Sequence, residues 1–316
     1  MGALDHQLGI KDETVYGTAV TVDRFFEYNS ESVKASEGRT ESDPLRVGQF
    51  VQRSDRYTPW YMGAAGTVQM DVLTKGFGIW LKHMLGAVVT TGVGPYTHTG
   101  TMADLYGKSF TAQLARPLHP SGTVQPFTYA GGKVTSWTIS NSVDAHLLLD
   151  LECDFASEAT ATALAAAAYP ASMEPLSWVG GVVTVGGASF DVTEISIAGN
   201  NGLDTERRFI RGSSTKKEPT GARREVSFSM AADFDSLAQR NRVHTEVRAD
   251  SLAEITGTWT NGTSSLAVTI PAGRFDDFEA SAGGPEALSQ SLSGVARYDG
   301  SNSPVRIVYT SGDAVA

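Results

Sequence analysis

The sequence predicts a mainly β protein built from two related halves. Apolar and polar residues alternate over short stretches along most of the chain, which is the pattern of strands with one buried and one wet face. Glycine is abundant, with 33 residues, and turn signals such as Asn261-Gly262 separate the alternating stretches. Charge-bearing helical runs are scarce, which also favours a β-rich chain.

Length and charge limit the classes of function. The 316 residues suffice for one large or two ordinary domains, and 25 Lys and Arg against 35 Asp and Glu give a net charge of −10. An acidic chain is poorly suited to hold nucleic acid, because affinity for phosphates comes from cations. The single cysteine, Cys153, excludes an internal disulfide and a thiolate-rich zinc site, and its alternating surroundings predict a buried apolar role. No stretch approaches the ~18 apolar residues of a membrane span.

The first half begins with a polar N-terminal arm over residues 1–20 and a strand over 25–34. A charged segment without periodicity, residues 35–58, follows and then a strand over 66–73. Residues 77–85 have helical spacing, with Gly86 as the expected C-cap. Further strands are expected at 109–114, 125–129, 133–140 and 146–155.

The alternation stops at an alanine-rich run, residues 157–170, which ends at Pro170 and is followed by Pro175. Alanine favours a short helix here, and the whole stretch is interpreted as a linker. The predicted domains are therefore 1–156, which includes the N-terminal arm, and 176–316, joined by a linker over 157–175.

The second half repeats the order of the first. A charged loop over 200–224 stands between two strands, and a helix is expected near residues 235–247. Its predicted strands are 182–185, 190–198, 225–230, 254–259, 266–270, 274–281, 287–297 and 305–310. When the halves are aligned at one constant offset, Gly132 falls on Gly273 and Trp137 on Phe278. Two unrelated β domains that share only generic alternation are the alternative interpretation.

The sequence contains no recognisable catalytic or metal-binding motif. The six histidines lack metal-ligand spacing, and Lys108-Ser109 fails the phosphate-loop frame because Met102 stands where the first glycine belongs. Asp150, Glu152 and Asp154 have the i, i+2 spacing of one strand face, and solvation explains them without an acid/base role. We therefore expect no enzyme activity, no cofactor and no metal.

Several segments resemble one family, the tail tube (major tail) proteins of long-tailed bacteriophages. These are the opening stretch 9–20, the Ser-Glu-Ser at 30–32 with the charged loop after it, the Gly-Ala-Ala-Gly at 63–66 before a strand and helix, and the stretch 178–187. The resemblance covers essentially the whole chain in order and spacing. It implies a structural virion protein of β-sandwich or barrel domains, each flanked by a short helix, whose inner strands join those of neighbours in a closed oligomeric barrel.

The same resemblance implies rings that stack into a hollow tube, through which DNA is ejected without specific binding. Residues on the wet strand faces would then line the lumen. The lumen-facing set is Glu27, Asn29, Glu31, Gln69, Asp71, Asp150, Glu152, Asp154, Ser227, Ser229, Asp277 and Glu279.

The two charged loops are expected to make the contacts between stacked rings, because complementary charges fix the orientation of an interface. The ring-stacking set is Arg39, Glu41, Arg46, Arg53, Arg56, Arg207, Arg208, Arg211, Lys216, Lys217 and Arg223. Since one chain supplies two domains, a trimeric pseudo-hexameric ring of about twenty-four inner strands is favoured over a homohexamer in which the second half decorates the outside.

The implied location is the virion tail, after assembly in the host cytoplasm, and the implied partners are tape-measure, tail terminator and distal tail proteins. Other functions stay open. A β-sandwich binding or adhesin-type protein would present aromatic residues on a sheet, whereas Trp60, Tyr61, Trp137, Trp178 and Trp259 are scattered. A distal tail protein or the tube of a contractile tail is a nearer alternative, and a hydrolase that uses Asp150 and Glu152 is the remaining one.

Overall fold

The computed structural model describes residues 5–249, 252–280 and 288–316, and within them the chain is mainly β. The first strands are β1 (Gln7–Asp12), β2 (Arg24–Phe26), β3 (Ser30–Glu31), β4 (Lys34–Glu41), β5 (Tyr57–Asp71), β6 (Gly86–Thr91), β7 (Tyr96–Met102), β8 (Phe110–Pro117), β9 (Val124–Ser142), β10 (Leu148–Phe155) and β11 (Ser157–Ala159). The later strands are β12 (Gly181–Val185), β13 (Ala188–Ser189), β14 (Val192–Asn200), β15 (Leu203–Asp204), β16 (Thr220–Gly221), β17 (Glu225–Asp233), β18 (Ala253–Asn261), β19 (Ser264–Glu279), β20 (Ser289–Ala296) and β21 (Arg306–Ser311). The helical elements are α1 (Gly78–Leu85), α2 (Ala238–Ala249) and the 3₁₀ turn η1 (Trp178–Gly180).

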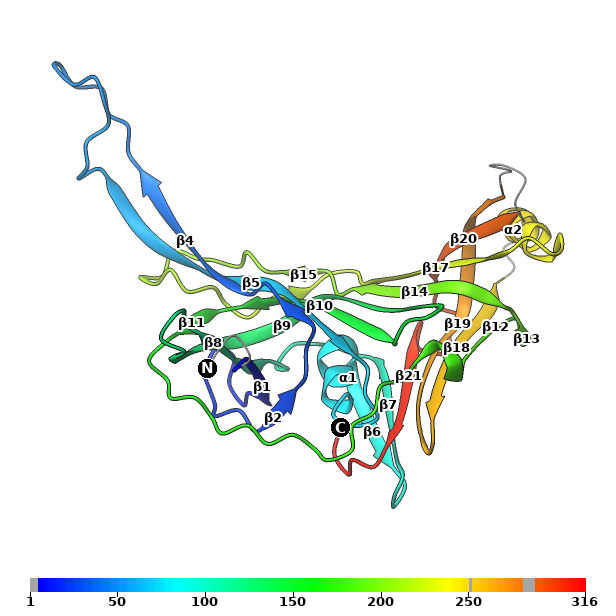
Figure 1. Ribbon diagram of the computed structural model, residues 1–316. Helices are drawn as coiled ribbons and strands as arrows, with labels where there is room; N and C mark the ends of the chain where they lie inside the picture. The colour runs from blue at the N-terminus through cyan, green and yellow to red at the C-terminus, as the bar shows by residue number, and fades with distance from the viewer. Residues whose placement is uncertain (1–4, 250–251, 281–287) are drawn as a thin grey trace.

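One antiparallel sheet runs through both halves of the chain. Its central strands follow the order β4–β5–β10–β9–β14–β17–β20–β19, and β3 pairs with β5 in line with β4. The pairing of β9 with β14, from Ser136 opposite Asn200 to Ser142 opposite Glu194, joins the first half directly to the second. In Figure 1 these strands cross the middle of the molecule, and α1 lies below them.

The strands form where the sequence alternates. In β5, Val68 and Met70 are buried while Thr67 is exposed, and β10 repeats this pattern with the buried Leu149 and Leu151. Such alternation buries one face of a sheet and leaves the other wet. The strand predicted at residues 66–73 is therefore confirmed as the C-terminal part of β5.

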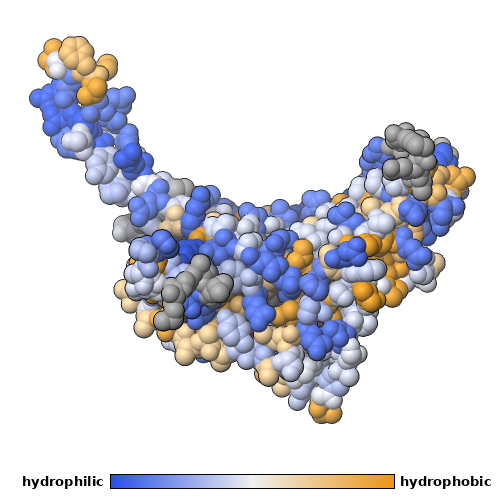
Figure 2. All heavy atoms as spheres, in the orientation of Figure 1, coloured by the Kyte–Doolittle hydropathy of each residue, from blue (hydrophilic) through white to orange (hydrophobic). Residues whose placement is uncertain are grey.

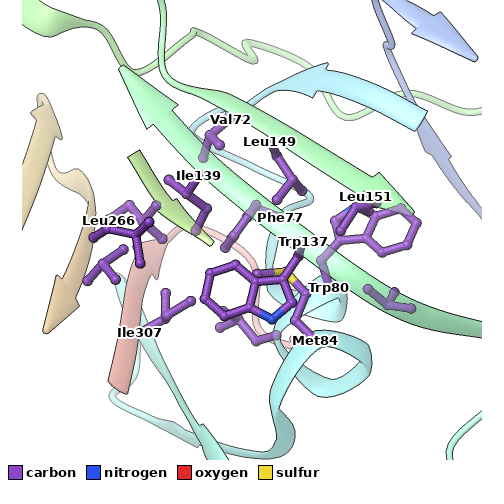
Figure 3. Close-up of a cluster of buried hydrophobic side chains, with 14 of the residues drawn as sticks. Val72, Phe77, Trp80, Met84, Trp137, Ile139, Leu149, Leu151, Leu266 and Ile307 are labelled. Atoms are coloured by element: carbon purple, nitrogen blue, oxygen red, sulfur yellow. The ribbon is translucent and has the colours of Figure 1, made fainter. Parts of the chain in front are cut away.

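Helix α1 covers the apolar face and forms the centre of the core. Trp80 on α1 and Trp137 on β9 are each 1% exposed, and Figure 3 shows both beside Ile139 and Leu151. Gly86 ends the helix with a φ of 108°, a conformation that a residue with a Cβ rarely adopts. Removing the Trp80 side chain should cost about 3–5 kcal/mol of unfolding free energy.

The two halves share the positions of their irregularities. Between β9 and β10 the register shifts at Thr135, and between β19 and β20 it shifts at Asp276, the position that the constant offset assigns to Thr135. A second shift follows Phe110 in the β8–β9 pairing and Ala253 in the β18–β19 pairing. A β-bulge is a specific local insertion, so generic alternation does not explain two coincident ones.

One local expectation that differs from the structure concerns the alanine-rich run. This run is extended rather than helical, because Gln113 donates to the carbonyl of Ala163 and accepts from the amide of Ala165. The N-terminal arm is extended from Gln7 to Asp12, where it forms β1 and pairs with β8 and β2. The helices expected at 77–85 and near 235–247 are confirmed as α1 and α2.

Candidate functional site

The polar face of the central sheet is the main candidate site. Residues directly opposite one another on antiparallel strands share a face, so the registers define its members. In the first half, Gln69 lies opposite Asp150 and donates to its carboxylate at 2.9 Å, and Ser136 lies opposite Glu152 and donates to it at 2.8 Å. The first-half members are Lys34, Ala65, Thr67, Gln69, Asp71, Ser136, Thr138, Ser140, Ser142, Leu148, Asp150 and Glu152.

The second half continues this face without interruption. Ser140 on β9 lies opposite Ser196 on β14, and Ser196 lies opposite Ser229 on β17. The second-half members are Glu194, Ser196, Ala198, Asn200, Glu225, Ser227, Ser229, Ala231, Ser291, Ser293, Val295, Asp277 and Glu279. The face therefore consists mostly of small polar side chains that cross the boundary between the halves.

Carboxylates set the charge of this face. Glu152, Asp277 and Glu279 are exposed, and Asp71 and Asp150 are half-buried. Glu225, which lies opposite Asn200 and is exposed, adds a carboxylate that the strand patterns did not single out. Lys34, opposite Ala65, is an exposed cation on this face, but carboxylates outnumber it, so the face as a whole repels a polyanion.

Eight of the residues expected in the lumen share this face: Gln69, Asp71, Asp150, Glu152, Ser227, Ser229, Asp277 and Glu279. Asn29 lies at its edge, because its side-chain amide donates to Asp71 at 2.9 Å, and Glu27 is exposed outside a strand. Glu31 lies elsewhere. Since Ser30 is in register with Gln69, Glu31 points to the other face, where Arg116 donates to it at 2.7 and 2.8 Å.

Asp154 is also withdrawn from the exposed set. Its side chain is covered by Lys216, whose ammonium lies 2.5 Å from the carboxylate, and both side chains are buried. Burial raises the pKa of Asp154, and the charge of Lys216 opposes that rise. Neither residue has the accessibility that its expected role requires, because a segment distant in sequence folds over the end of β10.

The first charged loop is a projecting hairpin. Strands β4 and β5 extend from the body as a two-stranded ribbon, with Arg39 paired to Glu41 at 2.9 Å and Arg53 to Asp55 at 2.7 Å (Figure 1). Arg46 and Arg56 are exposed. The charged residues lie on the two-stranded shaft of the hairpin and in the turn that joins its strands. The four ring-stacking arginines of this loop are exposed or half-buried.

The tip of the hairpin is apolar, which the interpretation of this loop as charged missed. Leu45 and Phe50 are 103% and 99% exposed. Val47 and Val51 lie beside them in sequence, and Figure 2 shows the apolar end above a hydrophilic shaft. Exposed apolar clusters commonly mark contact surfaces. The signal was present in the sequence as four apolar residues between positions 45 and 51 of a charged stretch.

The second charged loop folds back over the first half. Besides Lys216, it contributes Glu218, whose carboxylate lies 2.5 Å from the ammonium of Lys133 on β9. Arg208 pairs with Glu206 and stacks over Trp60, and Arg207 donates to the backbone of Glu218. The remaining stacking candidates of this loop are placed as follows: Arg211 donates to the carbonyl of Thr215, Lys217 lies over Phe209, and Arg223 is exposed.

Arg224 ties the two halves together at the C-terminus of α1. Its guanidinium donates to the carbonyls of Met84, Leu85 and Ala103 and to the side chain of Asn201, at 2.6 to 3.0 Å. A helix leaves its last carbonyls without intrahelical partners, and a cation satisfies both these groups and the helix dipole. Burial lowers the pKa of Arg224 to about 10, so the side chain stays charged at neutral pH.

The sheet has an unpaired edge at each end. Strands β3 and β4 pair with β5 on one side, and in the described part of the chain no strand pairs with their other side. Residues 274–279 of β19 likewise pair with β20 alone among the described strands. Unpaired edges present rows of backbone donors and acceptors that can pair with another chain.

The geometry offers little for catalysis or metal binding. Within the described residues, no three His, Cys, Asp or Glu side chains form a group that could hold a metal ion. Cys153 is buried, and burial raises the pKa of its thiol. Asp150 and Glu152 hydrogen-bond to polar neighbours instead of lying in an apolar pocket. No helix in the described ranges is long and apolar enough to cross a membrane.

Comparisons with known proteins agree with a structural role. None of the curated proteins matches the chain. A family model described as phage tail tube protein matches residues 3–296, nearly the whole length. An adhesin-type protein would present aromatic side chains on the surface of a sheet, whereas Trp137 and Trp259 are buried. Because this match covers nearly the whole chain, the protein belongs to the phage tail tube protein family, a structural family of the bacteriophage tail.

Proposed function

We propose that the protein is the subunit of a phage tail tube, and that three copies close into each ring. Each chain would supply two tandem tail-tube domains, 1–156 and 176–316, joined by the segment 157–175. The observation that carries this proposal is the β9–β14 joint, which places strands of both halves in one sheet. A decorating second half would instead leave the barrel sheet to the first half alone.

The count of strands supports a trimer. The central sheet has eight positions, with β3 and β4 sharing the first, and each half supplies four of them. Three such sheets would give about twenty-four strands in a closed barrel, which leaves no free edge. The two coincident bulges support the equivalence of the halves, so a trimer would have pseudo-sixfold symmetry.

The polar face would line the lumen through which DNA passes. Double-stranded DNA carries about one charge per 1.7 Å, and a cationic wall would retain it. A wall made mostly of serine, threonine and carboxylates would repel the phosphates weakly, and Lys34 would be an exposed cation on it. The lumen-facing set would then be the polar-face residues given above. Compared with the set expected from the sequence, it lacks Glu31 and Asp154 and includes Glu225 and Ser196.

The hairpin β4–β5 would contact the next ring. Its apolar tip has no cover within the described part of its own chain, and a second copy is the partner that a stacked ring provides. Tape-measure, terminator and distal tail proteins would bind at the ends and inside the tube, after assembly in the host cytoplasm.

Electron microscopy of the purified protein tests the proposal. Hollow tubes or stacked rings are the expected result, in particles with a uniform central bore. Monodisperse monomers at concentrations up to the solubility limit would contradict it, and an adhesin-type protein would give that result.

A further inference from the structure

We propose that residues 277–279 of β19 in one copy pair with residues 34–36 of β3–β4 in the next copy, in a single register that sets Glu279 opposite Lys34. This inference rests on the proposed function, because it describes the joint between neighbouring copies of the chain. It follows from a joint that the chain already forms within itself, between β9 and β14.

The registers fix which strands correspond. The shared bulges relate β9 to β19 at the constant offset that takes Thr135 onto Asp276. The same offset relates β10 to β20 and takes Leu151 onto Leu292. Leu151 pairs with Val68 on β5 and Leu292 pairs with Met230 on β17, so β5 corresponds to β17 and Val68 to Met230. The offset between β5 and β17 also takes α1 onto α2. The positions of the two helices therefore agree independently with the strand registers.

The edge strand follows from the same reasoning. Strand β14 pairs with β17 as the β3–β4 strand pairs with β5, which makes Val33 the counterpart of Ile197. Both of these side chains are buried. The β9–β14 joint therefore has a counterpart made by β19 and β3–β4, the first and last of the eight central strand positions, whose outer sides pair with no strand among the described residues. Within one chain these edges belong to opposite ends, so a second copy must supply the partner.

The pairing of β19 in one copy with β4 in the next copy is called the seam. Transferring the β9–β14 register to it gives its residue pairs. Thr138 opposite Ala198 becomes Glu279 opposite Lys34, and Ser136 opposite Asn200 becomes Asp277 opposite Ser36. Trp137 opposite Gly199 becomes Phe278 opposite Ala35. All three pairs follow from one and the same register.

The sizes of the side chains that would meet at the apolar pair, Phe278 and Ala35, support this register. Within the chain, Trp137 leaves no room for a side chain at position 199, where a Cβ would lie 2.3 Å from the indole. At the seam the smaller Phe278 stands opposite Ala35, so the loss of ring volume on one strand is matched by a methyl group on the other. Phe278 is half-buried and packs against the core from its own side.

The charges at the polar position support it as well. Lys34 and Glu279 are both exposed, and neither has an ion-pair partner among the described residues. Opposite charges that face one another across antiparallel strands stabilise the pairing, and like charges destabilise it. A shift by one residue would place Lys34 against Phe278 and send each side chain to the wrong face.

Disulfide trapping tests the register, since Cys153 is buried and does not compete. The variant Lys34→Cys/Glu279→Cys should give, after oxidation of assembled rings, a covalent species of three chains on a denaturing gel that reverts to monomer on reduction. The variant Lys34→Cys/Phe278→Cys is the off-register control and should stay monomeric. Thr138→Cys/Ala198→Cys is the matched control for geometry, because it should form the equivalent bond inside one chain whether or not rings assemble.

A charge swap gives a second readout. Lys34→Glu should abolish or strongly reduce assembly of folded protein, and Lys34→Glu/Glu279→Lys should restore it. Tubes that form normally while the first cysteine pair stays unlinked and the internal pair links would overturn the proposed register. A covalent ladder that ends at six chains would support the register and refute the trimer, and wild-type protein that never assembles would overturn the tube function and the seam together.

Discussion

Trp137 occupies the space that a side chain at Gly199 would need, at the point where the two halves of the chain meet. A Cβ on Gly199 would lie 2.3 to 2.5 Å from three atoms of the indole. The two residues are direct partners in the β9–β14 pairing, so the close approach of the halves at this point depends on the absence of a methyl group. Glycine in mid-strand usually weakens a sheet, and here close packing gives it a specific reason.

Gly199→Ala should therefore destabilise the folded chain by about 1–3 kcal/mol, because the tryptophan must move out of a packed core. Gly221→Ala is the matched control, since a Cβ there meets no atom within 4 Å. Urea unfolding of both variants measures the difference. Equal midpoints for the two would contradict the tight packing of the joint.

Arg224→Ala should cost about 3 kcal/mol of unfolding free energy, because it removes the charged donor from the carbonyls of Met84 and Leu85 at the end of α1 and from the carbonyl of Ala103. Its neighbour Arg223 is exposed, and Arg223→Ala should change stability by less than about 0.5 kcal/mol. Thermal unfolding at matched protein concentration compares the two. The proposed capping role does not survive if both arginines prove equally dispensable.

Phe50→Asp should leave folded rings that fail to stack, because a carboxylate replaces the most prominent aromatic group of the hairpin tip. Phe50→Leu keeps the tip apolar and should still give tubes. Tube length in negative-stain images, together with the mass of the unstacked species, provides the measurement. Normal tubes from the aspartate variant would show that the tip lies outside the stacking contact.

Ser136→Lys/Glu152→Lys should convert part of the lumen wall into a phosphate-binding surface. Tubes of this variant should retain short duplex DNA at low salt and release it as salt rises, since each phosphate contact adds to the salt dependence. Glu174→Lys, an exposed change on the segment that joins the halves, adds a charge without altering the polar face. DNA retained equally by the two variants would argue against a luminal position for Glu152.

The sequence was informative where a property depends on neighbours in the chain. Alternation correctly assigned Val68, Met70, Leu149 and Leu151 to the buried face of the sheet, and helical spacing located α1. It was less successful where a distant segment decides the outcome. The burial of Asp154 depends on Lys216, and the direction of Glu31 depends on the register of β3 against β5. The alanine-rich run is extended for the same reason, since side chains of other strands hold its backbone.

The number of chains in one ring tests the central claim most directly, and native mass spectrometry of isolated rings together with end-on images of tubes measures it. The account predicts three chains of 33.5 kDa, about 100 kDa in total, with threefold symmetry that resembles sixfold at low resolution. A ring of six chains, about 200 kDa, with strict sixfold symmetry would contradict the claim that both halves of each chain contribute to one barrel.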